Sequence, residues 1–214
     1  MLLRHGETSW NAENRFQGQS DTPLSPLGVQ QAIALARRLE QTPLDAFYAS
    51  DLSRAVDTAG FILAGRGLDL IEQKDLREIS FGSWEGLTSA EVTSQRSQVE
   101  LWSRYRADPM NHRPPGGETL QQLESRVVSA LERIVGAHPG QMVALATHGG
   151  VIKAAVVWAL GLALERRRQL TLDNASITCL KFQGAEITLD RLNDAAHLEK
   201  KSAELHPTSP GLFL

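Results

Sequence analysis

The chain has 214 residues, of which 42% are hydrophobic and 22% charged, and its formal net charge is −3 at pH 7. This length allows one large domain or two small ones and is sufficient for a substantial core. The charge gives no sign of a nucleic-acid surface or a polybasic membrane patch. No apolar run approaches the roughly 18 residues of a membrane span. The single cysteine, Cys179, excludes an internal disulfide framework. Because the N-terminus lacks a signal-peptide pattern, we expect a cytoplasmic protein that binds neither nucleic acid nor membrane.

Strands alternate with helices along the chain, which is typical of an α/β layered domain. Short apolar runs predict strands over residues 1–4, 45–49, 68–73 and 141–147, and an alternating pattern predicts a hairpin of strands 176–182 and 186–192. Helices are expected from Pro26 to Leu39, over 51–64, from Leu120 to His138-Pro139-Gly140, and over 149–160. We therefore predict a three-layer α/β/α fold with a mostly parallel central sheet and one antiparallel edge strand.

The segment from Thr88 to Pro115 is more polar than the rest and contains short helical stretches with several arginines. We interpret residues 88–115 as a small helical cap inserted into a single domain that covers residues 1–197. The polar, proline-containing residues 198–214 are expected to form a flexible C-terminal tail.

Four of the predicted strands end at a group suited to phosphate chemistry. Arg4 and His5 follow the first strand, Arg54 lies early in the helix after the second, Glu78 follows the third and His148 the fourth. Ligand sites of open α/β sheets lie at the carboxyl ends of the strands. Each of these residues alone could be structural, but together they favour one site that holds an anion and attacks it.

The motifs around these residues resemble, in their order and spacing, those of the histidine phosphatase superfamily, which includes the cofactor-dependent phosphoglycerate mutases. The resemblance extends from Leu2 to about Leu198. It is carried by Arg4-His5-Gly6-Glu7-Thr8, Asn11, Arg15-Phe16-Gln17-Gly18, Leu24-Ser25-Pro26-Leu27-Gly28, Ser50-Asp51-Leu52-Ser53-Arg54-Ala55, Glu78 with Phe81-Gly82-Ser83-Trp84-Glu85-Gly86, Pro115-Gly116-Gly117-Glu118-Thr119 and Thr147-His148-Gly149-Gly150.

The resemblance implies a role for each site residue. His5 would be the nucleophile that forms a transient phosphohistidine, and Glu78 would protonate the leaving oxygen and later activate water. Arg4 and Arg54 would hold the phosphoryl oxygens in forked hydrogen bonds, and a cationic His148 would add a further donor. Further contacts with the phosphate or substrate are expected from Thr8, Asn11, Gln17, Gly18 and Gly149. Asn11 and Gln17 could instead stabilise their loop. With the phosphoryl charge neutralised by these cations, the resemblance implies neither a metal ion nor a cofactor.

The same pocket could pass the phosphoryl group to water or to the hydroxyl of a sugar acid. At positions where the mutases carry groups that grip phosphoglycerate, this chain has Ile79 and Gly150, and it has Gln17-Gly18 in place of Thr-Gly. Losing polar partners of a carboxylate weakens recognition strongly. The sequence therefore favours a metal-independent phosphomonoester hydrolase acting on a small phosphorylated metabolite, resembling the broad-specificity or α-ribazole phosphatases. The alternatives are a cofactor-dependent phosphoglycerate mutase and a non-catalytic module that binds a phosphorylated ligand. Either a monomer or a homodimer is expected.

Several other side chains admit two interpretations. Trp84 and Trp102 could stack on a substrate ring or simply pack in the interior. The arginines of the 88–115 segment could bind a carboxylate or second phosphate, or could be solvated: Arg96, Arg104, Arg106 and Arg113. The run Arg166-Arg167-Arg168 is interpreted as a solvated helix face.

Overall fold

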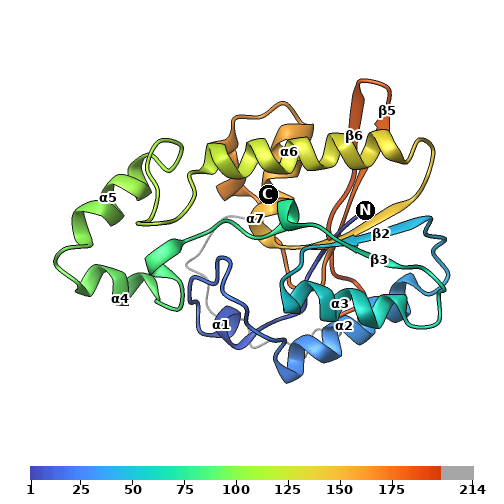
Figure 1. The fold of residues 1–214 in the computed structure, drawn as a ribbon, viewed down its shortest axis with the longest axis horizontal. Helices are drawn as coiled ribbons and strands as arrows, with labels where there is room; N and C mark the ends of the chain where they lie inside the picture. Colours follow the sequence, from blue (N-terminus) through green and yellow to red (C-terminus); the bar gives the residue numbers. More distant parts are fainter. Residues whose placement is uncertain (199–214) are drawn as a thin grey trace, which may run out of the picture.

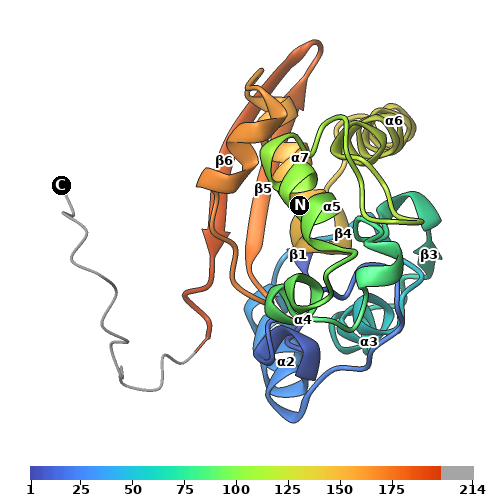
Figure 2. The same ribbon diagram turned by 90° about the vertical axis from the view of Figure 1, so that its left-hand side faces the viewer.

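A computed structural model describes residues 1–198 of the chain, so residues 199–214 of the expected tail lie outside the described residues. Its centre is a six-stranded sheet in the order β3-β2-β4-β1-β5-β6, with helices on both faces (Figure 1, Figure 2). The strands are β1 (Leu2–Arg4), β2 (Ala46–Ala49), β3 (Leu70–Glu72), β4 (Val143–Thr147), β5 (Ile177–Gln183) and β6 (Glu186–Asp194). The α-helices are α1 (Ser9–Ala12), α2 (Pro26–Leu39), α3 (Ser53–Leu63), α4 (Ser89–Ser94), α5 (Val99–Ala107), α6 (Leu120–Ala137) and α7 (Gly149–Ala159). Short 3₁₀ helices are η1 (Lys74–Leu76), η2 (Gly82–Trp84) and η3 (Leu164–Gln169).

The sheet is mostly parallel, which confirms the predicted fold class. Strands β1, β2, β3 and β4 run in one direction, with Leu3 of β1 opposite Ala146 of β4. Strand β5 is the antiparallel strand: it pairs with β1 through Leu3 and Ile177, and β6 then pairs with β5 at the edge of the sheet. Because β1 lies between β4 and β5, the residues that follow β1 emerge at the middle of the sheet.

Alternating side chains of the inner strands fill two separate cores. Leu2 and Tyr48 belong to the cluster that includes the buried faces of α6 and α7. Their neighbours Leu3 and Phe47 belong to the cluster on the opposite face, with residues of α2 and α3. Successive residues of a strand point to opposite faces. Because both faces of the sheet are covered by helices, the inner strands need the near-continuous apolar runs that the sequence shows.

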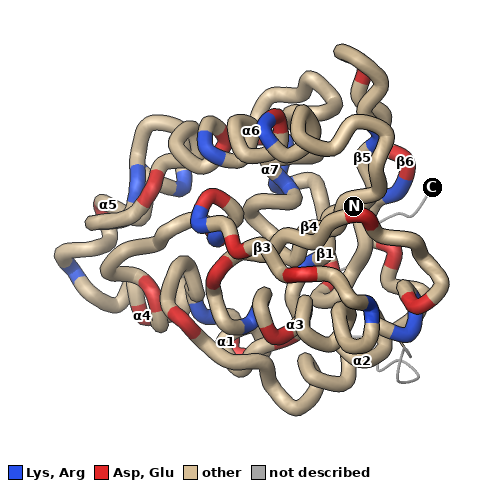
Figure 3. Tube along the Cα trace, turned by 45° about the vertical axis from the view of Figure 1, so that its right-hand side comes forward, with Lys and Arg blue, Asp and Glu red and all other residues tan. Residues whose placement is uncertain are grey.

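Helices α2 and α6 begin at polar capping residues. Ser25 Oγ accepts a hydrogen bond of 3.0 Å from the Gly28 N–H at the start of α2. At the start of α6, Thr119 and Gln122 form a reciprocal capping box. Acidic and basic residues both occur along α6 (Figure 3). In the described part of the chain, no helix is both long and apolar enough to cross a membrane.

Helices α4 and α5 of the 88–115 segment lie at one end of the molecule, on the left of Figure 1. They pack on an aromatic cluster in which the rings of Trp84 and Trp102 are 5.4 Å apart. Trp84 is 1% exposed, and its indole N–H donates to Gln98 Oε1 at 3.0 Å. Of the two interpretations of these tryptophans, the structure supports packing.

Candidate functional site

The site lies where the parallel strands end. The N–H of His5 donates to the carbonyl of Thr147 at 2.9 Å, and the N–H of Ser50 donates to the carbonyl of Ala146 at 3.0 Å. These bonds bring the residues that follow β1, β2 and β4 to one edge of the sheet. The imidazole rings of His5 and His148, far apart in the chain, have centroids 5.1 Å apart.

The hydrogen bonding of His5 fixes which ring nitrogen can react. Its Nδ1 lies 2.7 Å from the carbonyl oxygen of Gly6. A carbonyl can only accept, so Nδ1 carries the proton and Nε2 keeps its lone pair in the neutral ring. Burial, with the charges of Arg54 and Arg4 adding to it, holds the pKa of His5 well below its usual range. The ring is therefore neutral at physiological pH, with Nε2 able to act as a nucleophile.

His148 is fully buried and accepts a hydrogen bond at Nδ1 from Arg54 Nε at 3.3 Å. An arginine can only donate, so the ring proton lies on Nε2, which is 2.8 Å from Ser50 Oγ. Burial is the main cause that holds the pKa of His148 well below its usual range, followed by Arg54 and His5. In the site without its substrate His148 is therefore neutral, and the expected cationic form with phosphate bound stays a prediction.

The two arginines are held by backbone carbonyl groups. Arg54, fully buried on α3, donates from Nη1 to Ser20 O and from Nη2 to Gly18 O, both at 2.8 Å. Arg4 donates from Nη1 to Leu172 O at 2.6 Å, while its buried Nε has no partner within residues 1–198. Burial lowers the pKa of both guanidinium groups. They are concentrated, poorly solvated positive charges of the kind that bind phosphate.

Glu78 borders the same region and is held by two backbone amides. Its Oε1 accepts from Ile79 N–H at 2.9 Å and its Oε2 from Gly150 N–H at 3.0 Å. A Cβ at Gly150 would lie 2.1 Å from Glu78 Oε1, so this close approach requires glycine. The carbonyl of Glu78 accepts from Arg126 Nη2 at 2.9 Å, and Arg126 also forms a forked pair with Glu118. Helix α6 thereby positions Glu78, a contribution that the sequence analysis missed.

Thr8, Asn11 and Gln17 bond mainly to one another. Thr8 Oγ1 donates to Gln17 Oε1 at 2.9 Å, and the N–H of Thr8 donates to Asn11 Oδ1 at 3.1 Å. Asn174 Nδ2 donates both to Asn11 Oδ1 and to the carbonyl of His5. These bonds stabilise the loop beside His5, and the predicted contact of the three side chains with substrate stays a prediction.

Gly18 and Gly149 can contribute only backbone groups to the site. Gly18 has φ +55°, and a Cβ there would lie 2.1 Å from Glu85 Oε1. Gly149 begins α7, and its Cα approaches the Arg4 side chain closely enough that a Cβ would be 3.5 Å from Nε. The N-terminus of α7 thus opens next to Arg4, where the helix dipole favours an anion, and the Gly150 N–H of its first turn already donates to the Glu78 carboxyl group.

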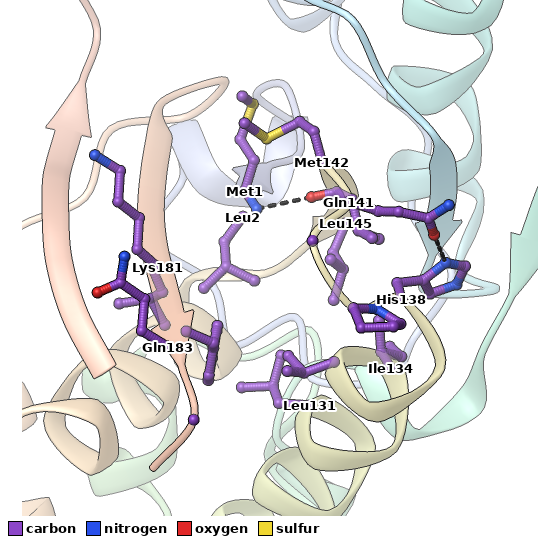
Figure 4. Close-up of a pocket in the computed structure, with 17 residues that line it drawn as sticks. Met1, Leu2, Leu131, Ile134, His138, Gln141, Met142, Leu145, Lys181 and Gln183 are labelled. Atoms are coloured by element: carbon purple, nitrogen blue, oxygen red, sulfur yellow. Dashed lines mark hydrogen bonds between the residues drawn. The ribbon is translucent and has the colours of Figure 1, made fainter. Parts of the chain in front are cut away.

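A cavity of about 200 Å³ lies against Arg4 and Glu78. Its lining includes Arg4, Glu78, Gly150, Lys153, Arg167 and Leu172. A larger cavity of about 580 Å³ lies near the N-terminus, and Figure 4 shows Met1, Leu131 and Met142 among its mainly apolar lining. The larger cavity contains none of the site residues predicted above. Within residues 1–198, no group of three or more His, Cys, Asp or Glu side chains is arranged so that it could hold a metal ion.

The structure shows which arginines of the 88–115 segment and of the run Arg166-Arg167-Arg168 are exposed to solvent and which line the cavity. Arg166 and Arg168 are exposed, as expected for a solvated helix face. Arg167 differs: it lines the 200 Å³ cavity, and its buried Nε has no partner among the described residues. The arginines of the 88–115 segment are all exposed and contribute nothing to the lining of this cavity: Arg96, Arg104, Arg106 and Arg113.

Comparison with known proteins identifies the family. Residues 1–195 match the histidine phosphatase superfamily (branch 1). Phosphoglycerate mutase-like protein 4 of Arabidopsis thaliana is 37% identical over 204 residues, covering 94% of this chain and 86% of that protein. The putative phosphoserine phosphatase 2 of Hydrogenobacter thermophilus is 35% identical over 196 residues, covering 92% and 95%. The solved structure of α-ribazole phosphatase from Shigella flexneri has a TM-score of 0.84 at 28% identity, covering 90% of this chain and 94% of that one.

The fold and the motifs at its strand ends therefore define an enzyme of the phosphatase class. The chain belongs to the histidine phosphatase superfamily, as its motif order predicts.

Proposed function

We propose that this enzyme hydrolyses small phosphate monoesters through a phosphohistidine formed at Nε2 of His5. The observation that carries the proposal is the 2.7 Å bond between His5 Nδ1 and the carbonyl of Gly6, because it directs the lone pair of the neutral ring to Nε2. The low pKa of His5 supports the proposal, since only the neutral ring is a nucleophile.

In the first step, the Nε2 lone pair attacks phosphorus and the bond between phosphorus and the leaving oxygen breaks. The carboxyl group of Glu78, at the border of the cavity, gives its proton to that oxygen. Arg4 and Arg54 hold the remaining phosphoryl oxygens and offset the charge that spreads over them. When the dianion is bound, a proton on His148 Nδ1 would give it a further donor.

In the second step, a water molecule attacks the phosphorus of the phosphohistidine. Glu78, now a carboxylate, takes the proton of that water, and the phosphorus–Nε2 bond breaks. Inorganic phosphate leaves, and His5 regains its neutral ring with the proton still on Nδ1. A positioned acid–base group of this kind typically contributes about 10²–10⁴-fold to the rate.

The site favours water over a sugar acid as the acceptor. A Cβ at Gly150 would meet the Glu78 carboxyl group in its present position, and Ile79 is apolar and buried. These are the positions at which the resemblance implies the phosphoglycerate grip of the mutases. The cavity of about 200 Å³ is also smaller than the roughly 300–1,000 Å³ that drug-sized ligands occupy, which supports a short leaving group.

We further propose that no metal ion takes part, because Arg4, Arg54 and a protonated His148 supply the positive charge that the phosphoryl group requires. Treatment with a chelator is expected to leave the release of phosphate unchanged. A loss of activity that divalent cations restore would contradict this part of the proposal. With its one cysteine reduced, the enzyme is proposed to act in the cytoplasm.

The test is a single-turnover reaction with p-nitrophenyl phosphate, quenched in alkaline denaturant and examined by intact mass spectrometry. We expect a burst of p-nitrophenol together with one phosphoryl group on the protein, and neither in the His5→Ala variant. The matched control is His112→Ala, which removes a half-exposed histidine of the 88–115 segment. Activity that persists in His5→Ala would refute the proposal. Isomerisation of 3-phosphoglycerate with a bisphosphoglycerate primer would instead indicate the mutase.

A further inference from the structure

We propose that Lys153 and Arg167 form a second anion subsite, which selects phosphate esters whose leaving group carries a carboxylate. This inference rests on the function proposed above and specifies the substrate class of the same site.

Both side chains line the cavity of about 200 Å³ that also contacts Arg4 and Glu78. Lys153 lies on α7, one helical turn after Gly149, and Arg167 lies on η3. The phosphoryl group is proposed to bind at Arg4, and Glu78 gives its proton to the leaving oxygen. A cavity bordered by these two residues is therefore where the leaving group extends, and Lys153 and Arg167 meet it there.

The two cations have no counterion in the described structure. Within residues 1–198, neither Lys153 nor Arg167 lies within 4.0 Å of a carboxylate oxygen, and the buried Nε of Arg167 has no hydrogen-bond acceptor. The exposed neighbour Arg168 differs, because it donates to the carbonyl of Arg106 at 3.1 Å. A buried donor without a partner is unfavourable, and a bound acceptor would relieve this.

Electrostatics points to an anion at the same place. Burial, followed by the positive charges of Arg167 and Arg4, lowers the pKa of the Lys153 ammonium, and Glu78 opposes this effect. Burial likewise lowers the pKa of Arg167. Within residues 1–198, Glu78 carries the one acidic group in the lining of the cavity, against the three cations Arg4, Lys153 and Arg167. A phosphate dianion bound at Arg4 and Arg54 leaves the charges of Lys153 and Arg167 available.

The side chains that line the cavity favour a carboxylate as the second anion. A guanidinium group binds a planar carboxylate through two parallel hydrogen bonds, and Lys153 adds a point charge. Ile79, Phe81 and Leu172 supply an apolar wall for the carbon atoms between the two anions. A short chain would fit the volume of about 200 Å³.

The test compares O-phosphoserine with O-phosphoethanolamine, which differ by the carboxylate alone. We expect the wild-type enzyme to have the larger kcat/KM for O-phosphoserine, mainly through KM. Replacing Lys153→Met or Arg167→Met should reduce the ratio of the two kcat/KM values by about tenfold or more, as for loss of one charge-assisted hydrogen bond. Arg167→Lys, which keeps the charge, should restore part of the preference. The matched control is Arg166→Met, which removes an exposed charge from the same helix.

Each outcome decides between the two proposals. Equal kcat/KM values for the two substrates in the wild-type enzyme, or an unchanged ratio in both methionine variants, would overturn the subsite while leaving the phosphatase intact. A preference for glycerol bisphosphate over glycerol phosphate, without one for O-phosphoserine, would show a second-phosphate site and also overturn it. No phosphate released from any substrate, p-nitrophenyl phosphate included, would overturn the proposed function and the subsite with it.

Discussion

Nε of Arg54 donates a hydrogen bond of 3.3 Å to Nδ1 of His148, and both side chains are fully buried. Before substrate binds, the Nδ1 lone pair of His148 therefore accepts a hydrogen bond from the Arg54 guanidinium group. To donate to a phosphoryl oxygen, His148 must take up a proton on this same nitrogen. Binding of the dianion and protonation of His148 are thus coupled.

The first prediction concerns this coupling. We expect the ¹⁵N shifts of the His5 and His148 rings to show neutral, single-tautomer imidazoles near pH 6.5, their usual pKa, because burial and the arginines lower both pKa values. Binding of orthovanadate at the same pH should be accompanied by proton uptake, measured by calorimetry in buffers of different ionisation enthalpy. Doubly protonated rings in the free protein would contradict the prediction.

The second prediction concerns the contact between Gly150 and Glu78. In Gly150→Ala the new Cβ would lie 2.1 Å from Glu78 Oε1 and displace the carboxyl group. We expect kcat/KM for an alkyl phosphate to fall by about 10²-fold, and that for p-nitrophenyl phosphate to fall less, because a good leaving group needs less protonation. The control is Gly136→Ala on α6, where a Cβ meets nothing within 4 Å. That change should stabilise the fold by about 0.5–1 kcal/mol. Equal losses for both substrates in Gly150→Ala would argue against Glu78 as the acid.

The third prediction compares two arginines of α6. Arg126 donates to the carbonyls of Asp75, Arg77 and Glu78 and pairs with Glu118, whereas the exposed Arg133 pairs with Asp75. We expect Arg126→Met to lower the free energy of unfolding by roughly 2–3 kcal/mol, because it leaves several carbonyls without a donor. Arg133→Met should change it by less than about 1 kcal/mol.

Urea denaturation measures both values. If the two variants were equally stable, the bonds of Arg126 to the segment before Glu78 would contribute nothing to the fold.

The fourth prediction concerns stability against pH. His5 and His148 have lowered pKa values in the folded protein, so below about pH 6.5 the unfolded chain binds more protons than the folded one. The free energy of unfolding should therefore fall as the pH drops below 6.5. His148→Gln should reduce this slope by up to about 1.4 kcal/mol per pH unit. An unchanged slope in urea titrations of the variant would show that His148 titrates alike in both states.

The sequence was sufficient to predict the framework of the site. The first, second and fourth strands are short and strongly apolar, and each leads directly into a polar step, so their carboxyl ends could be placed at one edge of the sheet. The weaker third strand is less accurate: its predicted range of 68–73 is wider than the observed Leu70–Glu72. Which hydrogen bonds His148 makes could not be predicted, because its partner Arg54 is 94 residues away in the chain.

The supporting residues could not be predicted for a different reason. Arg126 acts through carbonyls of the segment before Glu78, and nothing in a helical pattern shows which backbone a long side chain will meet. Arg167 looks like its exposed neighbours in the sequence. It faces inward because η3 is a 3₁₀ helix, in which residues three apart share a face, and the buried Leu164 precedes it by three.

The buried Nε groups of Arg4 and Arg167 have no hydrogen-bond partner within residues 1–198, so the stability of this protein should depend on the anions in the buffer. An anion that binds only the folded state stabilises it by mass action, by about 2.7 kcal/mol at a hundredfold excess over its Kd. The protein should therefore melt at a higher Tm in phosphate than in chloride of equal ionic strength. Phosphate in a purification or storage buffer would then occupy the positions that the substrate needs.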